Sequence, residues 1–145
     1  MWIVAKYKSK EFEILKESFA KILGDMPEFY NPKIKCQRYI NNKLKSFEKN
    51  ILDNYLICKH SKFVDPKIIN ALKNSRGLNY ILDGFKFNQN EINNFIKYCK
   101  SQEDGNGFLN QNFFNISKKT KAQFMSGPFT QMIFSVVENK GKILK

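Results

Sequence analysis

Residues 2–24, WIVAKYKSKEFEILKESFAKILG, decide the fold, because a strand pattern is followed there directly by a helix pattern. Trp2 to Tyr7 is a short apolar run with lysines at its end, which is typical of a buried first strand. From Lys10 to Leu23, apolar residues recur at three- and four-residue steps, which predicts an amphipathic helix. Ser9 offers a cap for this helix and Gly24 a stop. Its apolar stripe requires a sheet or a second helix to cover it.

Strand and helix patterns continue to about residue 100. Lys33 to Ile40 alternates between apolar and polar residues as a half-exposed strand does, and the polar stretch 41–50, NNKLKSFEKN, is typical of a mobile hairpin tip. Ile51 to Cys58 has the pattern of a second, more apolar strand. Asp65 and Pro66 match the cap and first position of a short helix.

After that short helix, Gly77 is a helix breaker, and residues 78–82, LNYIL, form a further strand pattern. A third helical stripe follows at i, i+3, i+4 and i+7, made of Ile92, Phe95, Ile96 and Cys99. The element order is therefore β-α-β-β-α-β-α. It predicts an α+β fold of the ferredoxin-like kind, in which helices cover one side of an antiparallel sheet.

The chain changes character after residue 100. Residues 101–117 are polar and rich in Gly and Asn, which favours a linker between residues 1–100 and 118–145. The last segment has the pattern of short strands and turns, with Gly127-Pro128 at one turn. A piece this short cannot bury a core of its own, so it is the front part of a longer β unit or docks on the first domain.

Composition narrows the classes of function. Lys and Arg number 25 against 13 Asp and Glu, a formal charge of +12, which favours polyanionic partners but also serves solubility. Basic residues gather between Lys33 and Lys62, where the carboxylates are Glu48 and Asp53. The cysteines Cys36, Cys58 and Cys99 lie far apart, so neither a disulfide framework nor a zinc site is indicated.

Nothing in the sequence indicates an enzyme, a cofactor, a metal or a catalytic residue. His60 is the chain's one histidine, no spacing supplies it with a second base or a carboxylate, and we interpret it as a surface residue at a strand end. The start of the chain lacks the pattern of a signal peptide, and no apolar run approaches the ~18 residues of a membrane span. We therefore expect a cytoplasmic monomer without a membrane partner.

Four segments, in order along nearly the whole chain, resemble the NusG family, and most closely its specialised RfaH-like paralogs. They are Trp2-Ile3-Val4 at the start, Leu52-Asp53-Asn54-Tyr55-Leu56-Ile57, Ser75-Arg76-Gly77-Leu78, and the KOW-like Ser126-Gly127-Pro128-Phe129. The resemblance implies a NusG N-terminal domain at 1–100 and a partial KOW-type unit at 118–145. Departures include Leu52-Asp53 in place of Phe-Pro, and Phe134 where the KOW pattern has glycine.

The resemblance also implies a function. Such factors bind the clamp helices of RNA polymerase and act on pausing or termination, in elongation or antitermination. The polymerase-binding positions would be Leu52, Tyr55, Ile57 and Ile81, with Tyr55 as the exposed aromatic anchor, although all four also suit a strand core. The KOW segment would recruit a ribosome or a termination factor.

A second contact that the resemblance implies is to the non-template DNA strand, through Lys8, Ser75 and Arg76. For Lys8 alone, a solvated surface lysine is the plainer interpretation. Two other functions remain open from the sequence. One is a general basic RNA- or DNA-binding module, with Tyr39 and Phe47 as stacking groups in the basic stretch. The other is an adaptor that binds a protein partner and no nucleic acid.

Overall fold

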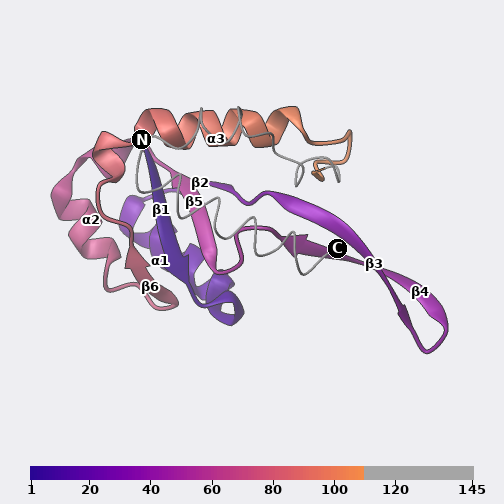
Figure 1. The fold of residues 1–145 in the computed structure, drawn as a ribbon. Helices are drawn as coiled ribbons and strands as arrows, with labels where there is room; N and C mark the ends of the chain where they lie inside the picture. The colour runs from indigo at the N-terminus through magenta and orange to yellow at the C-terminus, as the bar shows by residue number, and fades with distance from the viewer. Residues whose placement is uncertain (110–145) are drawn as a thin grey trace. The chain divides into compact units, whose positions relative to one another are not determined.

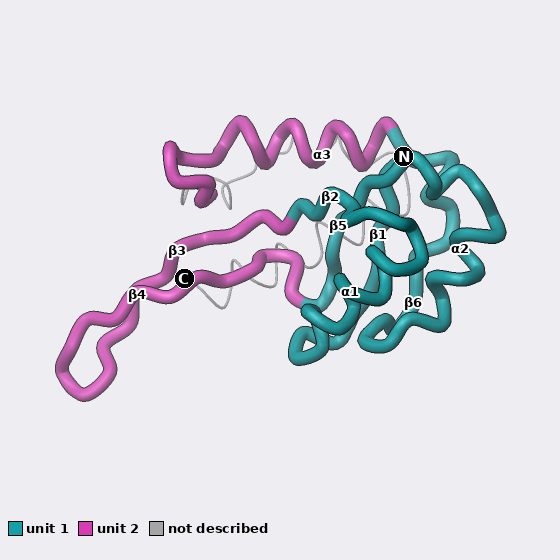
Figure 2. Tube along the Cα trace, turned by 180° about the vertical axis from the view of Figure 1, so that it is seen from behind, with its two compact units in different colours: residues 1–30, 54–89 teal, residues 31–53, 90–145 magenta. Residues whose placement is uncertain are grey.

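The computed structural model describes residues 1–109, shown in colour in Figure 1. In this range the chain is α+β, with three α-helices and antiparallel sheets. The chain divides into two compact units, residues 1–30 with 54–89, and residues 31–53 with 90–145 (Figure 2). The predicted KOW-type segment 118–145 and the linker residues 110–117 lie outside the described residues.

A four-stranded sheet forms the centre of the first unit. It consists of β1 (Trp2–Tyr7), β2 (Glu28–Tyr30), β5 (Tyr55–Lys59) and β6 (Leu78–Ile81) in the order β2-β5-β1-β6, and every neighbouring pair is antiparallel. Strand β1 pairs with both β5 and β6, which explains why it is apolar and mostly buried. The predicted strands at 2–7 and 78–82 are therefore present, and β2 was not predicted.

Helix α1 (Phe12–Leu23) packs on one face of this sheet. The Phe12 ring lies 5.3 Å from the ring of Tyr7 on β1 and 5.7 Å from that of Phe29 on β2. Gly24 ends the helix as predicted, with φ of +89° and its N–H bonded to the carbonyl of Ala20. The predicted Ser9 cap is wrong: Ser9 begins a 3₁₀ turn (Ser9–Glu11), and no side-chain cap bond is present there.

Helix α2 (Pro66–Leu72) is capped as the sequence predicts. The Asp65 side chain accepts a hydrogen bond of 2.9 Å from the N–H of Lys67, and Pro66 occupies the first turn, where its missing N–H costs nothing. Helix α3 (Gln89–Ser101) buries the predicted stripe of Ile92, Phe95, Ile96 and Cys99. The burial of this stripe confirms the helix that the apolar spacing predicts.

The second unit contains a long two-stranded ribbon, which corrects the predicted mobile tip. Strands β3 (Lys33–Ile40) and β4 (Lys43–Asn50) pair over their whole length, so residues 43–50 are a strand. Asn41 and Asn42 join them with φ of +53° and +61°. Positive φ at both turn residues is the requirement of a type I′ hairpin, which asparagine tolerates.

The first part of the predicted linker has a defined turn. Asp104 accepts hydrogen bonds from the N–H groups of Asn106 (2.9 Å) and Phe108 (3.0 Å). Isolated bridges pair Glu103 with Leu109 and Lys33 with Phe108. An aspartate that satisfies local N–H groups in this way explains how a Gly- and Asn-rich stretch stays ordered.

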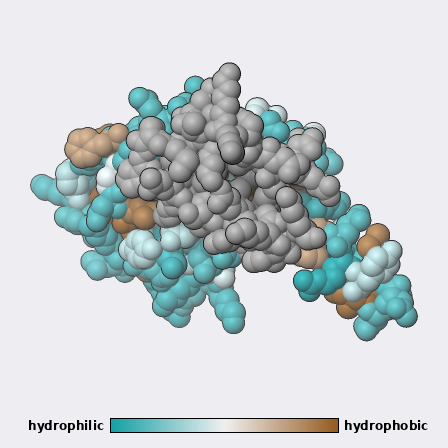
Figure 3. Space-filling view, viewed as in Figure 1, coloured by the Kyte–Doolittle hydropathy of each residue, from teal (hydrophilic) through white to brown (hydrophobic). Residues whose placement is uncertain are grey.

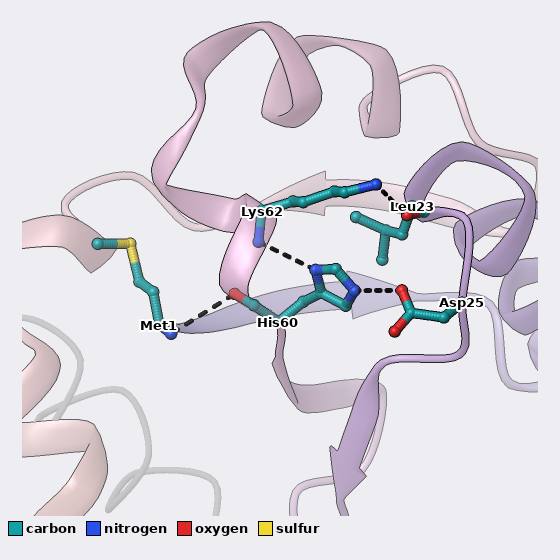
Figure 4. A network of polar contacts seen from close by, with 5 residues as sticks. All are labelled: Met1, Leu23, Asp25, His60 and Lys62. Carbon is teal, nitrogen blue, oxygen red and sulfur yellow. Dashed lines mark hydrogen bonds and ion pairs between the residues drawn. The ribbon is translucent and has the colours of Figure 1, made fainter.

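His60 and Lys62, which follow β5, join that segment of the first unit to the end of α1 and the loop after it (Figure 4). The Nε2 of His60 lies 2.6 Å from Asp25 Oδ1, and its Nδ1 accepts a hydrogen bond of 3.0 Å from the N–H of Lys62. Lys62 Nζ in turn donates to the carbonyl oxygen of Leu23 at 2.6 Å, at the end of α1. The His60 side chain is only 8% exposed, so the strand-end position was right and the surface interpretation was wrong.

The three cysteines are expected to differ in reactivity. Burial, followed by the charge of Glu28, raises the pKa of the Cys58 thiol, and Cys99 is also buried, whereas Cys36 on the ribbon is partly exposed. Since the thiolate is the nucleophile, brief treatment of the native protein with iodoacetamide should modify Cys36 alone. Mass spectrometry of the peptides, with denatured protein as the control, measures this. Equal labelling of Cys58 and Cys36 in the native state would contradict it.

Candidate functional site

An exposed cluster of two tyrosines and a lysine lies across three adjacent strands of the first unit. Lys6 on β1 pairs in register with Tyr55 on β5 and with Tyr80 on β6. Directly opposite residues share a sheet face, so these three side chains lie together, on the face opposite to Tyr7 and α1. We call Lys6, Tyr55 and Tyr80 the tyrosine cluster.

The contacts inside the tyrosine cluster hold its rings in place. The ammonium of Lys6 lies 5.7 Å from the ring centroid of Tyr55 and 6.0 Å from that of Tyr80, both within cation–π range. The two hydroxyl oxygens are 3.4 Å apart. Tyr80 is 45% exposed and Tyr55 is half-buried. Rigid amphipathic rings with accessible faces are the groups that contribute most to protein association.

The hydroxyl pair affects the titration of Tyr55. Its hydrogen bond with Tyr80, then burial, then the charge of Tyr80 raise the pKa of Tyr55 above its usual value near 10. Because the folded-state pKa is raised, the pair adds stability at pH values below the ordinary pKa. That stability is lost as pH rises through the folded-state pKa.

Tyr80→Phe is expected to lower the pKa of Tyr55 toward its usual value, because the first-ranking cause of the shift is removed. NMR titration of the tyrosine ring resonances measures this, with Tyr39→Phe on the ribbon as the control that leaves Tyr55 unchanged. A Tyr55 pKa that is the same in wild type and Tyr80→Phe would mean that the hydroxyl pair does not form in solution.

The other three predicted polymerase-binding residues are buried. Leu52 is 1% exposed, in the turn before β5, and belongs to the second unit. Ile57 is 0% exposed, on the same sheet face as Tyr55 and opposite Val4. Ile81 is 6% exposed and pairs with Ala5, so it lies on the other face. Of the four, Tyr55 is the one that presents accessible surface.

The turn before β6 brings the predicted nucleic-acid-binding residues close together. The backbone N–H of Lys8 donates a hydrogen bond of 2.8 Å to the carbonyl oxygen of Gly77, which places Lys8 beside Ser75 and Arg76. The Arg76 side chain is 73% exposed, and its Nε lies 3.6 Å from Glu11 Oε1. Surface pairs of this kind contribute little stability, so Arg76 can exchange Glu11 for a phosphate at small cost.

Ser75 differs from its two neighbours. It is buried, and its Oγ has no hydrogen-bond partner among the described residues. The buried Ser75 hydroxyl therefore faces no solvent, and the groups that the turn exposes to an anion are the cations Lys8 and Arg76. These two residues supply charge and, for Arg76, a planar fork of donors.

Lys6 and Tyr80 were not among the predicted site residues. The signal for them was present in the period-2 alternation of β1 and β6, which places Lys6 on the face opposite to Tyr7, and Tyr80 on the face opposite to Ile81. Which of these alternate residues meet Tyr55 depends on strand order and register, which sequence alone does not supply.

The comparisons with known proteins add no site to these two. Residues 1–109 contain no group of three or more His, Cys, Asp or Glu placed to hold a metal ion, and no helix long and apolar enough to cross a membrane. A scan against protein-family models finds none that matches this chain, and a search of curated proteins finds no significant match. The candidate sites therefore rest on the geometry of the tyrosine cluster and of the Lys8–Arg76 turn.

Proposed function

We propose that this chain is a transcription elongation or antitermination factor of the NusG type, closest to its RfaH-like members. It acts as a cytoplasmic monomer that binds the clamp helices of RNA polymerase through its first unit and catalyses no reaction. Contact with the non-template DNA strand through Lys8 and Arg76 then alters pausing or termination. Its KOW-type segment would recruit a ribosome or a termination factor.

The observation that carries the proposal is the tyrosine cluster. An accessible aromatic surface can bind a pair of helices whose apolar side chains protrude. Tyr55 lies in the tyrosine cluster, at the position that the family resemblance assigns to the anchor. Lys6 adds a cation that suits an acidic rim on the partner. Two further observations support it: Lys8 lies next to the Arg76 turn, and the strand order β2-β5-β1-β6 suits a split β-α-β arrangement.

Direct binding to polymerase tests the proposal. The 145-residue chain should bind core RNA polymerase, and a soluble fragment carrying the clamp helices should compete for that binding. A polymerase that lacks the clamp-helix tip is the matched control and should not bind. Absence of binding to core polymerase, together with tight and steeply salt-dependent binding to free nucleic acid, would favour the general nucleic-acid-binding module instead.

The DNA contact is tested separately on assembled elongation complexes. Arg76→Ala should reduce the effect on pausing while leaving the affinity for core polymerase unchanged, because Arg76 is exposed and outside the tyrosine cluster. Lys73→Ala, an exposed lysine at the end of α2, removes one charge elsewhere and serves as the control. If Arg76→Ala leaves pausing unchanged, the chain is an adaptor that does not touch DNA.

A further inference from the structure

The two faces of the β3–β4 ribbon differ in charge. Residues that are directly opposite one another share a face, and on one face four cations occur without a carboxylate. These four residues, the basic face, are Arg38, Lys43, Lys45 and Lys49. On the other face, Lys33 and Lys35 lie with Glu48, and Lys33 Nζ is 3.8 Å from the Glu48 carboxylate. The second face therefore carries two cations against one carboxylate, whereas the basic face carries four cations against none.

The basic face includes like charges in direct opposition. Arg38 and Lys45 are cross-strand partners, an arrangement that destabilises an antiparallel pair. An isolated two-stranded ribbon is only marginally stable, so this repulsion is a larger fraction of its stability than it would be in a large sheet. The Arg38 guanidinium lies 5.5 Å over the ring of Phe47, which keeps it on this face. A bound polyanion would offset this repulsion, because it attracts both cations.

We infer that the basic face of the β3–β4 ribbon is a docking surface for the major groove of duplex DNA. Lys43, Lys45 and Lys49 are spread over about 20 Å of β4 at ~3.4 Å per residue, which equals about six base-pair steps. Two strands about 4.8 Å apart, with their side chains, fit a groove about 12 Å wide. In Figure 3 the distal ribbon is mostly hydrophilic, with small hydrophobic groups among the polar ones.

Duplex DNA suits this surface better than RNA does. The major groove of A-form RNA is deep and narrow and excludes a ribbon. Single-stranded RNA is bound by rows of accessible aromatic rings, whereas the basic face offers one ring, Phe47, which is half-buried beneath Arg38. Tyr39 is 74% exposed, but it pairs with Leu44 on the other face. The binding is electrostatic and independent of sequence, and it requires no polymerase.

Fluorescence anisotropy with the 145-residue chain and a labelled mixed-sequence DNA duplex tests this inference. We expect micromolar binding that weakens with salt, as non-specific contacts to phosphates do. The test variant removes three exposed cations of the basic face: Arg38→Gln, Lys43→Gln and Lys45→Gln. It should lose roughly 100-fold in affinity at 0.1 M salt, and the slope of log K against log salt should become shallower by about 2–3.

A control variant removes the same charge from other exposed positions: Lys35→Gln on the second ribbon face, with Lys67→Gln and Lys73→Gln at helix α2. It should keep most of the affinity, and Tyr55→Ala should keep all of it, which separates this inference from the polymerase proposal. Equal losses in the two triple variants would overturn the inference, because net charge alone would then explain binding. Tighter binding to duplex or single-stranded RNA would overturn it too.

The fold of the test variant is checked by circular dichroism and thermal melting. Its melting temperature should stay the same or rise, because the substitutions relieve repulsion between Arg38 and Lys45. If the triple variant unfolds, Lys43→Gln and Lys45→Gln are measured singly. Each should then reduce the salt slope by about one, and unchanged slopes in both would overturn the inference.

Discussion

Tyr55→Ala is expected to weaken binding to the polymerase clamp helices by about 1–3 kcal/mol, roughly 5- to 150-fold in Kd, while the fold stays intact. The loss is expected because an accessible aromatic ring contributes most of its energy on association, when the partner excludes water from it. The fold should tolerate the change because the Tyr55 hydroxyl makes only a 3.4 Å contact with Tyr80, and its ring meets Lys6 near the surface. Titration of core polymerase, with thermal melts of the free protein, measures both effects.

Two variants show whether the ring itself matters. Tyr55→Phe keeps the ring and loses the hydroxyl, so its affinity should stay close to that of wild type. Tyr39→Ala makes the same truncation at an exposed ribbon tyrosine outside the first unit, and it should leave polymerase binding unchanged. If Tyr55→Ala binds polymerase as tightly as wild type and melts normally, the clamp-binding assignment is wrong. If the variant unfolds, Tyr55 belongs to the core.

Elements with local signals were predictable from the sequence. In α1 and α3 the apolar residues recur within three or four residues of each other, and Gly24 directly follows α1, so the pattern and the structure agree. Strand β4 has no such signal, because both faces of its distal part are exposed and most of its residues are polar. The indication available was Asn41-Asn42, since two adjacent residues that tolerate positive φ favour a type I′ turn between strands.

The candidate site was less predictable than the fold, because it depends on contacts between distant residues. Tyr55 was predicted from a family resemblance, whereas its neighbours Lys6 and Tyr80 depend on the order and register of three strands. The register of β6 also excludes Ile81 from the face that carries the tyrosine cluster. Since Tyr80 is the residue opposite Lys6, its neighbour Ile81 must face the other way. A shift of one residue in β6 would have exchanged the two.

Gly77→Ala is expected to destabilise the protein by about 2–4 kcal/mol, a fall in Tm of roughly 5–15 °C. Gly77 has φ of +89°, which costs an L-residue about 1–2 kcal/mol. A Cβ at this position would lie 2.9 Å from the carbonyl oxygen of Glu11 and 3.1 Å from its Cβ. The first of these is backbone at the start of α1 and cannot turn aside, so overpacking adds a second cost.

Gly105→Ala is the matched control for this prediction. A Cβ there meets nothing within 4 Å, and its φ is not in the strained positive range, so its stability should change by no more than about 0.5 kcal/mol. Thermal melts of both variants give the comparison. Equal stability of the two would mean that the turn holding Lys8 beside Arg76 is not packed on α1 in solution. The destabilised Gly77→Ala protein should also lose the pausing effect proposed for Arg76, because the N–H of Lys8 is bonded to the Gly77 carbonyl.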